Sequence, residues 1–170
     1  VILVRHGKSS WADPELEDHD RPLNPRGRRA APVIARWLAG RGHLPERVLC
    51  SSSLRTRETA RLMREAVPEL PEPAVETGLY HASPQRLLDR LRALDDMVSS
   101  VMLVGHNPGL SALTRKLAAP PVRPRCARAF EHFPTAAAAV FRAAIRRWSD
   151  LDYAGAEFAD YARPRELAPG

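Results

Sequence analysis

Residues 1–7 read Val1-Ile2-Leu3-Val4-Arg5-His6-Gly7, four apolar residues that run directly into arginine, histidine and glycine. A short apolar run with β-branched residues predicts a buried strand. Val48-Leu49-Cys50 and Val101-Met102-Leu103-Val104 have the same form. Because their apolarity is continuous rather than alternating, these runs are typical of parallel strands that are covered on both faces.

Helical segments are expected between these strands. Asn24 and Pro25 supply an N-cap and a proline at the first helical position, and Gly40 or Gly42 can end that helix. Pro32 inside it predicts a kink or a late start, because proline cannot donate the interior hydrogen bond. Further helices are expected over residues 53–66, from Ser83-Pro84 onward with a leucine face, and from Asn107-Pro108 to about residue 118.

The last part of the chain has a mixed pattern. Thr135 to Trp148 is ambiguous, because its alanines favour a helix while Val140-Phe141 favour a strand. Phe158 to Tyr161 is expected as a last edge strand. Strands that alternate with helices predict an α/β fold, a three-layer αβα sandwich with a mostly parallel central sheet. At roughly 150 residues per domain, the length predicts a single domain over residues 1–170.

Composition excludes several classes of protein. Apolar residues make up 44% and charged residues 27% of the chain, which is ordinary for a globular protein and not for a disordered chain or a collagen-like fibre. Cys50 and Cys126 are too few for a disulfide framework and lack metal-ligand spacing, so a reducing, cytoplasmic location is expected. The longest apolar run has six residues, far below the roughly 20 that cross a bilayer, so no membrane span is expected. No signal peptide is visible, and the start at Val1 inside an apolar run leaves open whether residues precede it.

The charge balance is 26 basic against 20 acidic residues, a formal net charge of +6. Such a balance raises the question of a nucleic-acid partner. However, no run of five like charges occurs, and no aromatic-rich basic strand indicates base stacking. A positive field that attracts an anionic substrate is therefore favoured over a nucleic acid.

Polar residues follow each predicted strand where it ends. Arg5-His6-Gly7 follows the first, Ser51-Ser52 and Arg55 follow the second, and Gly105-His106-Asn107 follows the third. Ligands of open α/β sheets lie beyond the carboxyl ends of the strands, so two histidines and two arginines are expected in one crevice. Arginine offers a planar fork of donors to phosphate oxygens, and a neutral imidazole can carry a phosphoryl group. The pattern therefore predicts phosphoryl-transfer chemistry.

Three motifs in this order carry a resemblance to a known family. Leu3-Val4-Arg5-His6-Gly7 resembles the signature of the histidine phosphatase superfamily, also called phosphoglycerate-mutase-like. The run from Ser51 through Arg55 to Thr59-Ala60 resembles its second motif, and Gly105-His106-Asn107-Pro108 resembles its third. Further matches, to the SixA-type phosphohistidine phosphatase branch, are Arg21-Pro22-Leu23-Asn24, Gly27 and Phe133-Pro134-Thr135-Ala136. The resemblance covers roughly residues 1–135, and it implies a phosphoglycerate-mutase-like fold without a cap subdomain in which residues 136–141 form a strand.

The resemblance also implies roles for individual residues. His6 is the nucleophile that becomes phosphorylated, and Arg5 and Arg55 clamp the phosphoryl oxygens. Arg57 is the nearby competitor of Arg55, but it fits the spacing of the motif less well. His106 binds an oxygen and stabilises the transition state. No metal and no other cofactor are implied, and no metal-ligand spacing in the sequence argues otherwise.

Four further residues are expected to contact the substrate. Arg21 sits at the pocket mouth and completes the clamp, unless it forms a surface salt bridge with the aspartates beside it. Ser9, in the loop after the nucleophile, can donate to phosphate. Gly7 permits a close approach of the ligand, and the helix start after Asn107 adds backbone donors.

A proton donor for the leaving group is not evident. Larger family members supply an acid near the phosphate, and Glu76 and His81 are the candidates in the corresponding segment here. General acid help is worth about 10²–10⁴-fold, which alkyl phosphate esters need more than phosphohistidine does, because imidazole leaves readily. The missing acid and the missing cap therefore favour phosphohistidine on a protein as the substrate.

Two alternatives remain open at this point. One is a small-molecule phosphomonoesterase that acts on a phosphorylated metabolite. The other is a non-catalytic module that binds a phosphorylated protein, although pure binding would not require a nucleophile. A monomer is the default expectation for the assembly.

Overall fold

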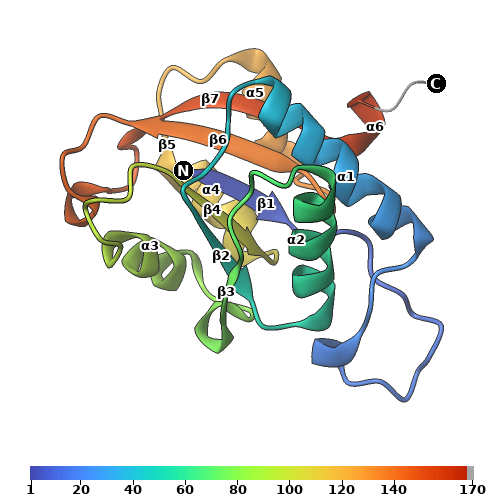
Figure 1. Cartoon of the computed structure of the whole chain (residues 1–170). Coiled ribbons are helices and arrows are strands. Elements are labelled where there is room, and N and C mark those ends of the chain that lie inside the picture. The colour runs from blue at the N-terminus through green and yellow to red at the C-terminus, as the bar shows by residue number, and fades with distance from the viewer. Residues whose placement is uncertain (168–170) are drawn as a thin grey trace.

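The computed structural model describes residues 1–167, which form a seven-stranded sheet with helices on both faces (Figure 1). The strands are β1 (Ile2–Arg5), β2 (Arg47–Ser51), β3 (Ala74–Glu76), β4 (Val101–Gly105), β5 (Ala118–Ala119), β6 (Ala138–Ala143) and β7 (Ala156–Ala162). The α-helices are α1 (Pro25–Gly40), α2 (Leu54–Ala66), α3 (Pro84–Arg92), α4 (Gly109–Leu117), α5 (Pro124–Glu131) and α6 (Pro164–Leu167). Short 3-10 turns lie at η1 (Asp18–Asp20), η2 (Thr77–Leu79) and η3 (Trp148–Asp150).

The sheet has the strand order β3-β2-β4-β1-β6-β7-β5. The first four strands in this order are parallel, and β6 runs antiparallel to both β1 and β7. Strands β1 and β4 pair in register, with Leu3 opposite Leu103 and Arg5 opposite Gly105. The expectation of a mostly parallel α/β sheet is confirmed.

Both faces of the sheet are covered, which explains the continuous apolarity of its strands. Along β1, Leu3 belongs to the core on the face of α3, α4 and α5, whereas Ile2 and Val4 belong to the core on the face of α1 and α2. Figure 1 shows α1 and α2 together on one side of the sheet and α3 on the other. The buried residues of β1 therefore pack alternately against the two helix layers.

The helix starts follow their capping signals. The Asn24 side chain accepts from the amide of Gly27 at the start of α1, and the Ser83 side chain accepts from the amide of Arg86 at the start of α3. Helix α1 begins at Pro25 and continues through Pro32, so the expected late start is wrong. Within residues 1–167, none of the helices combines the length and the apolarity that crossing a bilayer would require.

The last part of the chain differs from its local pattern. Ala138 and Ala139 enter β6, not a helix, because β6 pairs with β1 on one side and with β7 on the other. The strand that the family resemblance implies over residues 136–141 is therefore present, but it spans Ala138–Ala143, and Ala136 and Ala137 precede it. The predicted strand Phe158 to Tyr161 lies within β7, the last strand of the described chain. The two residues of β5 pair only with Ala156 and Glu157 at the start of β7, so β5 does not cover Phe158 to Tyr161. Strands β3 and β5 and helix α5 are short elements that the pattern did not indicate.

Candidate active site

His6 and His106 stand at the ends of two neighbouring parallel strands. His6 follows β1, His106 follows β4, and the amide of His6 donates to the carbonyl oxygen of Gly105 across 3.1 Å. The two ring centroids consequently lie 5.2 Å apart. Both residues are buried, with 8% and 4% of their surface exposed. The structure therefore brings the two strand-end histidines together.

The backbone of His6 is also held on its other side. The amide of Ala136, which precedes β6, donates to the carbonyl oxygens of both Arg5 and His6 at 3.0 Å each. Ala136 has a φ of 58°, a left-handed conformation that is uncommon for a residue with a Cβ. The chain segment that carries His6 is thus fastened between β4 and the entry to β6.

Hydrogen bonding fixes the tautomer of His6. Its Nδ1 lies 2.7 Å from the carbonyl oxygen of Gly7, which can only accept, so the ring proton resides on Nδ1. Nε2 then carries the lone pair, and the Nε of Arg55 donates a long hydrogen bond to it across 3.4 Å. The amide of Gly7 donates to Oγ1 of Thr59 at 2.9 Å, which ties the loop after His6 to α2. The His6 ring is therefore held in the tautomer whose Nε2 carries a lone pair.

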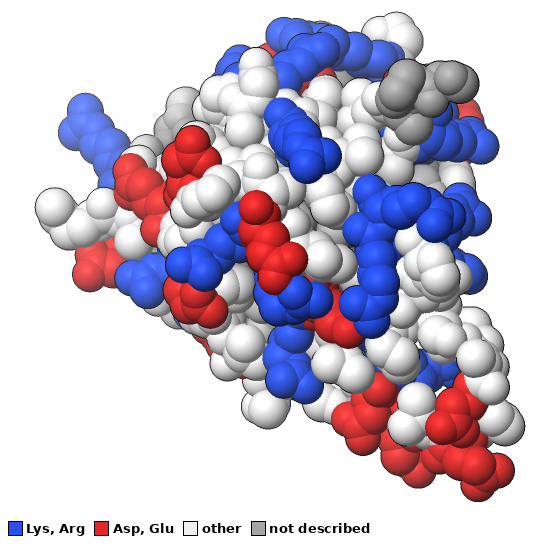
Figure 2. Space-filling model, turned by 45° about the vertical axis from the view of Figure 1, so that its right-hand side comes forward, with Lys and Arg blue, Asp and Glu red and all other residues white. Residues whose placement is uncertain are grey.

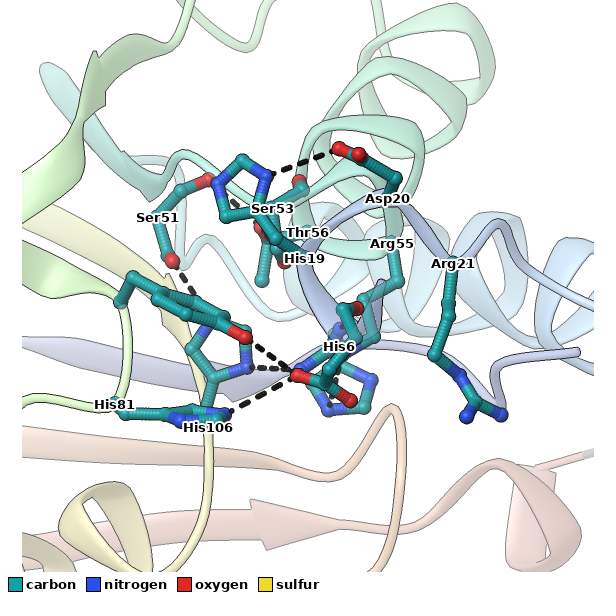
Figure 3. Close-up of polar contacts among 12 residues, drawn as sticks. His6, His19, Asp20, Arg21, Ser51, Ser53, Arg55, Thr56, His81 and His106 are labelled. Atoms are coloured by element: carbon teal, nitrogen blue, oxygen red, sulfur yellow. Dashed lines mark hydrogen bonds and ion pairs between the residues drawn. The ribbon is translucent and has the colours of Figure 1, made fainter. Parts of the chain in front are cut away.

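Arg55 connects the two histidines from the first turn of α2. Its Nη2 lies 3.4 Å from Nδ1 of His106, and Arg55 is only 5% exposed (Figure 3). On the other side of the His106 ring, Oγ of Ser51 lies 2.7 Å from Nε2. A guanidinium can only donate, so Nδ1 of His106 accepts from Arg55 here and Nε2 carries the ring proton toward Ser51. Because the Ser51 hydroxyl can also donate to Nε2, the ring can take the other tautomer and donate from Nδ1 when an anion replaces the Arg55 contact. Arg57, the competitor of Arg55 in the sequence, is exposed on α2.

Burial and neighbouring cations keep both imidazoles neutral. Burial lowers the pKa of His6 to about 4; the hydrogen bond to Gly7 opposes this, and the charges of Arg55 and Arg5 add to it. Burial likewise lowers the pKa of His106 to about 3, with further lowering from a positive charge on His6 and from Arg55. Near pH 7 the site therefore contains fixed guanidinium charge beside neutral imidazole.

Arg5 supplies a second buried guanidinium. Its Nη1 donates to the carbonyl oxygen of Phe133 at 3.0 Å, whereas its Nε is buried without a partner among the described residues. Asn107 donates to the same carbonyl oxygen at 2.9 Å. Burial and the charge of Arg55 lower the pKa of Arg5. A buried free donor beside another guanidinium favours the binding of an anion between them.

Arg21 and Ser9 have their own partners beside this cluster. Arg21 is buried, its Nη2 donates to the carbonyl oxygen of Ser10 at 2.7 Å, and its guanidinium carbon lies 3.0 Å from the ring centre of Trp11. This burial and stacking do not match a surface salt bridge. Ser9 is half-buried and pairs through its backbone with Leu23. No dashed contact joins Arg21 to the other residues of Figure 3.

The two candidate proton donors have different surroundings. Glu76 accepts from Nε and Nη2 of Arg90 at 2.8 and 2.7 Å, which holds its carboxylate in an ion pair at the end of β3. The ring of His81 stacks on Tyr80 with centroids 4.1 Å apart, and it lies 5.3 Å from the ring of His106. The structure therefore places His81 beside His106, whereas Glu76 is paired with Arg90.

An aspartate that sequence reasoning did not assign to the site joins this cluster. Oδ2 of Asp18, in η1, accepts from Nη2 of Arg55 at 2.9 Å and from the hydroxyl of Tyr80 at 2.5 Å. Nε2 of His81 lies 3.5 Å from the same oxygen. Asp18 is one of several acidic residues between positions 13 and 20, and nothing in their spacing distinguishes it.

Comparison with known proteins identifies the family of this site. A model of the histidine phosphatase superfamily (branch 1) matches residues 1–80. The phosphohistidine phosphatase SixA of Escherichia coli (strain K12) is 30% identical over 126 residues, which cover 69% of this chain and 73% of that protein. An uncharacterised protein of Mycobacterium tuberculosis (strain ATCC 25618 / H37Rv) is 36% identical over 166 residues, which cover 95% of this chain and 100% of that protein.

Solved structures agree with this assignment. A protein histidine phosphatase SixA complexed with tungstate has a TM-score of 0.78 and 26% sequence identity, with 98% of each chain covered. A structure from Nakamurella multipartitia, described as a candidate phosphohistidine phosphatase SixA, has a TM-score of 0.79 and 31% identity, with 96% of this chain and 95% of that chain covered. The chain therefore belongs to the histidine phosphatase superfamily, in its SixA-type branch, and it is a phosphatase.

Proposed function

We propose that this phosphatase works through a phosphohistidine intermediate on His6 and removes the phosphoryl group from phosphohistidine on a protein. The observation that carries the intermediate is the environment of the His6 ring. Its Nδ1 is bonded to the carbonyl oxygen of Gly7, and its Nε2 faces Arg55. A neutral imidazole with its lone pair directed at an anion-binding guanidinium is suited to attack phosphorus.

The first half of the reaction transfers the phosphoryl group to the enzyme. The Nε2 lone pair of His6 forms a bond to phosphorus while the P–N bond of the substrate breaks. The electron pair stays with the substrate ring, which carries a proton on its other nitrogen and therefore departs as neutral imidazole. Arg5 and Arg55 offset the charge on the phosphoryl oxygens, and His106 donates to one of them. In the second half, water attacks phosphorus, the P–N bond to His6 breaks, and Nε2 regains its lone pair.

The lack of an inserted subdomain after β3 supports a protein substrate. Between β3 and α3 the chain contains only the turn η2 and a short loop, with no helical subdomain over the histidines. A phosphohistidine on a protein surface could not approach these histidines past an inserted subdomain. The similarity to proteins named phosphohistidine phosphatase SixA supports the same substrate class.

A basic groove beside the nucleophile supports an anionic partner. Lys8, two residues after His6, lines a groove of about 410 Å³ together with the basic residues Arg26, Arg29, Arg163 and Arg165. Apolar residues, among them Val33, Pro134 and Pro164, make up most of its surface, and Arg163 is paired with Glu166. Figure 2 shows basic side chains grouped on the side of the molecule that carries α1 and α6.

The position of Asp18 supports a second candidate function, that of a small-molecule phosphomonoesterase. The preference for phosphohistidine rested partly on the lack of an acid near the phosphate, and a carboxylate does stand in the site. A carboxyl group near the leaving group would favour phosphate esters as well. A small-molecule phosphomonoesterase is therefore the alternative to test.

Rapid quenching tests the intermediate. The enzyme is mixed with a labelled phosphoryl donor, quenched, digested and mapped. We expect an acid-labile, alkali-stable label on His6 and turnover that EDTA does not change. His6→Ala abolishes turnover, and a variant that retained a near-wild-type rate would contradict the assignment.

A comparison of substrates tests the specificity. We expect kcat/KM for a histidine-phosphorylated protein to exceed kcat/KM for alkyl phosphomonoesters by at least the ~10²-fold that acid catalysis contributes to poor leaving groups. Comparable values for the two classes would favour the phosphomonoesterase.

A further inference from the structure

The carboxylate of Asp18 contacts Arg55, beside His6 and His106, although Asp18 lies outside the sheet. It lies in η1, in the long loop between β1 and α1, and its side chain is 47% exposed. Even so, Oδ2 meets Nη2 of Arg55 at 2.9 Å and the hydroxyl of Tyr80 at 2.5 Å. The backbone carbonyl oxygen of Asp18 also accepts from Nη1 of Arg55 at 2.5 Å. Two separate groups of one residue are thus bound to the guanidinium that faces the nucleophile.

Arg55 can hold Asp18 and a phosphoryl group together. A guanidinium carries five N–H donors in a planar fork. Those that contact Asp18 come from Nη1 and Nη2, while Nε faces His6 and Nη2 also approaches His106. A phosphoryl group on Nε2 of His6 would therefore share Arg55 with the Asp18 carboxylate, at close range.

We propose that Asp18 is the general base for hydrolysis of the phosphorylated enzyme. This inference rests on the proposed phosphohistidine intermediate on His6. Oδ2 of Asp18 accepts a proton from the attacking water while the water oxygen forms a bond to phosphorus. The bond between phosphorus and Nε2 of His6 breaks, and its electron pair returns to the imidazole. The products are inorganic phosphate, a neutral His6 and a protonated Asp18, which then loses its proton to solvent.

The ionisation state of Asp18 suits this role. Partial burial works to raise its pKa, but hydrogen bonds from Tyr80 and Arg55 outweigh burial and hold the pKa of Asp18 below its ordinary value. At neutral pH the free enzyme therefore holds a carboxylate, which accepts a proton and cannot donate one. The negative charge of a phosphoryl group on His6 would raise the proton affinity of Asp18 when a base is needed.

Neighbouring residues leave Asp18 as the carboxylate in position to act. The carboxylate of Glu76 is engaged by Arg90, away from the histidine pair. His81 lies 3.5 Å from Oδ2 of Asp18, and its side chain is 55% exposed. Both side chains reach solvent, so the proton can leave Asp18 directly or through His81.

The test measures the two half-reactions separately in the intact enzyme. Asp18→Asn keeps the shape of the side chain and removes the base. Labelled phosphoramidate serves as the phosphoryl donor, and rapid quenching follows the formation and decay of the label on His6. We expect formation within about threefold of wild type, and decay slowed by about 10²–10⁴-fold, the usual contribution of general base catalysis. Phosphorylated enzyme then accumulates at steady state.

Glu15→Gln is the matched control, because it removes one negative charge from an exposed position in the same loop. Its label should form and decay as in wild type, and circular dichroism confirms that both variants are folded. Wild-type decay in Asp18→Asn overturns the proposal. Equal slowing of both half-reactions also overturns it, because that result indicates a disturbed Arg55 and not a lost base. If the wild-type enzyme carried no label on His6, that result would contradict the proposed phosphohistidine intermediate. It would be distinguishable from the loss of a base, which leaves the label in place.

Discussion

The Nε of Arg55 donates to the Nε2 of His6 across 3.4 Å, although the two residues lie 49 positions apart in the chain. A guanidinium keeps its charge at any working pH, so a proton on Nε2 would face a fixed cation. The guanidinium of Arg55 therefore helps to keep the His6 ring unprotonated. In the proposed mechanism the same group also binds the phosphoryl oxygens, so one contact would serve both substrate binding and nucleophile activation.

The activity should persist far below the usual pKa of histidine. His6 reacts as the neutral ring, and its pKa of about 4 means that it becomes protonated only as the pH falls through that value. The acid limb of kcat/KM, measured on a stable phosphomonoester and corrected for ionisation of the substrate phosphate, should lie near pH 4. An acid limb near pH 6.5, the ordinary pKa of histidine, would contradict the conclusion that burial and the neighbouring arginines lower the pKa of His6.

Arg55→Ala should reduce kcat by about 10²–10³-fold, the usual effect of removing one electrostatic donor to the transition state. Arg55→Lys should recover little of the loss, because an ammonium group cannot reach His6, His106 and the anion with a planar fork. Steady-state kinetics with a small phosphoryl donor measures both effects. Arg57→Ala, at an exposed position of the same helix, is the control and should leave kcat unchanged.

Glu76→Gln should affect stability and spare activity. Its carboxylate is bound by two nitrogens of Arg90 at 2.8 and 2.7 Å in a half-buried pair. Loss of this pair should lower the free energy of unfolding by about 1 kcal/mol or less. Urea denaturation measures this loss, and kcat/KM should stay within about twofold of wild type. A large fall in kcat with stability unchanged would instead indicate a role in proton transfer.

Gly27→Ala should disturb both fold and function. A Cβ at this position would lie 2.3 Å from the carbonyl oxygen and 2.7 Å from the amide nitrogen of Lys8, in the loop after the nucleophile. Overpacking against backbone should cost about 1–3 kcal/mol and lower kcat by displacing that loop. Gly40→Ala, in the same helix but with no atom within 4 Å of its Cβ, should be neutral or stabilising by up to about 1 kcal/mol. Thermal denaturation of the two variants, Gly27→Ala and Gly40→Ala, measures this difference in stability.

The positions of the polar side chains at the strand ends could be predicted because they depend on short, local stretches of sequence. An apolar run followed at once by Arg5-His6 or by His106 places those side chains at one edge of a parallel sheet. The second motif likewise contains Ser51 and Thr59, whose hydroxyls lie 2.7 Å from His106 and 2.9 Å from the amide of Gly7. Motif and topology together thus predicted the core of the site.

The remaining features depend on contacts that no local pattern records. The alanines of β6 have a helical propensity, but pairing with β1 and β7 decides their conformation. Asp18 reaches Arg55 across 37 positions, from a loop that contains several equivalent acidic residues. Glu76 lies in the segment where an acid was sought, yet Arg90, 14 positions further on, engages it. Only the folded chain distinguishes the carboxylate in the site from the one outside it.

The two-sided attachment of the His6 backbone has a consequence for how the enzyme fails on heating. The amide of His6 is bonded to Gly105 and its carbonyl oxygen to Ala136, so the reactive residue is part of the hydrogen-bonded centre of the molecule. Flexible catalytic loops often melt before the body of a protein does. Here the orientation of the imidazole depends on the central sheet itself, so His6 should keep its position until the sheet opens.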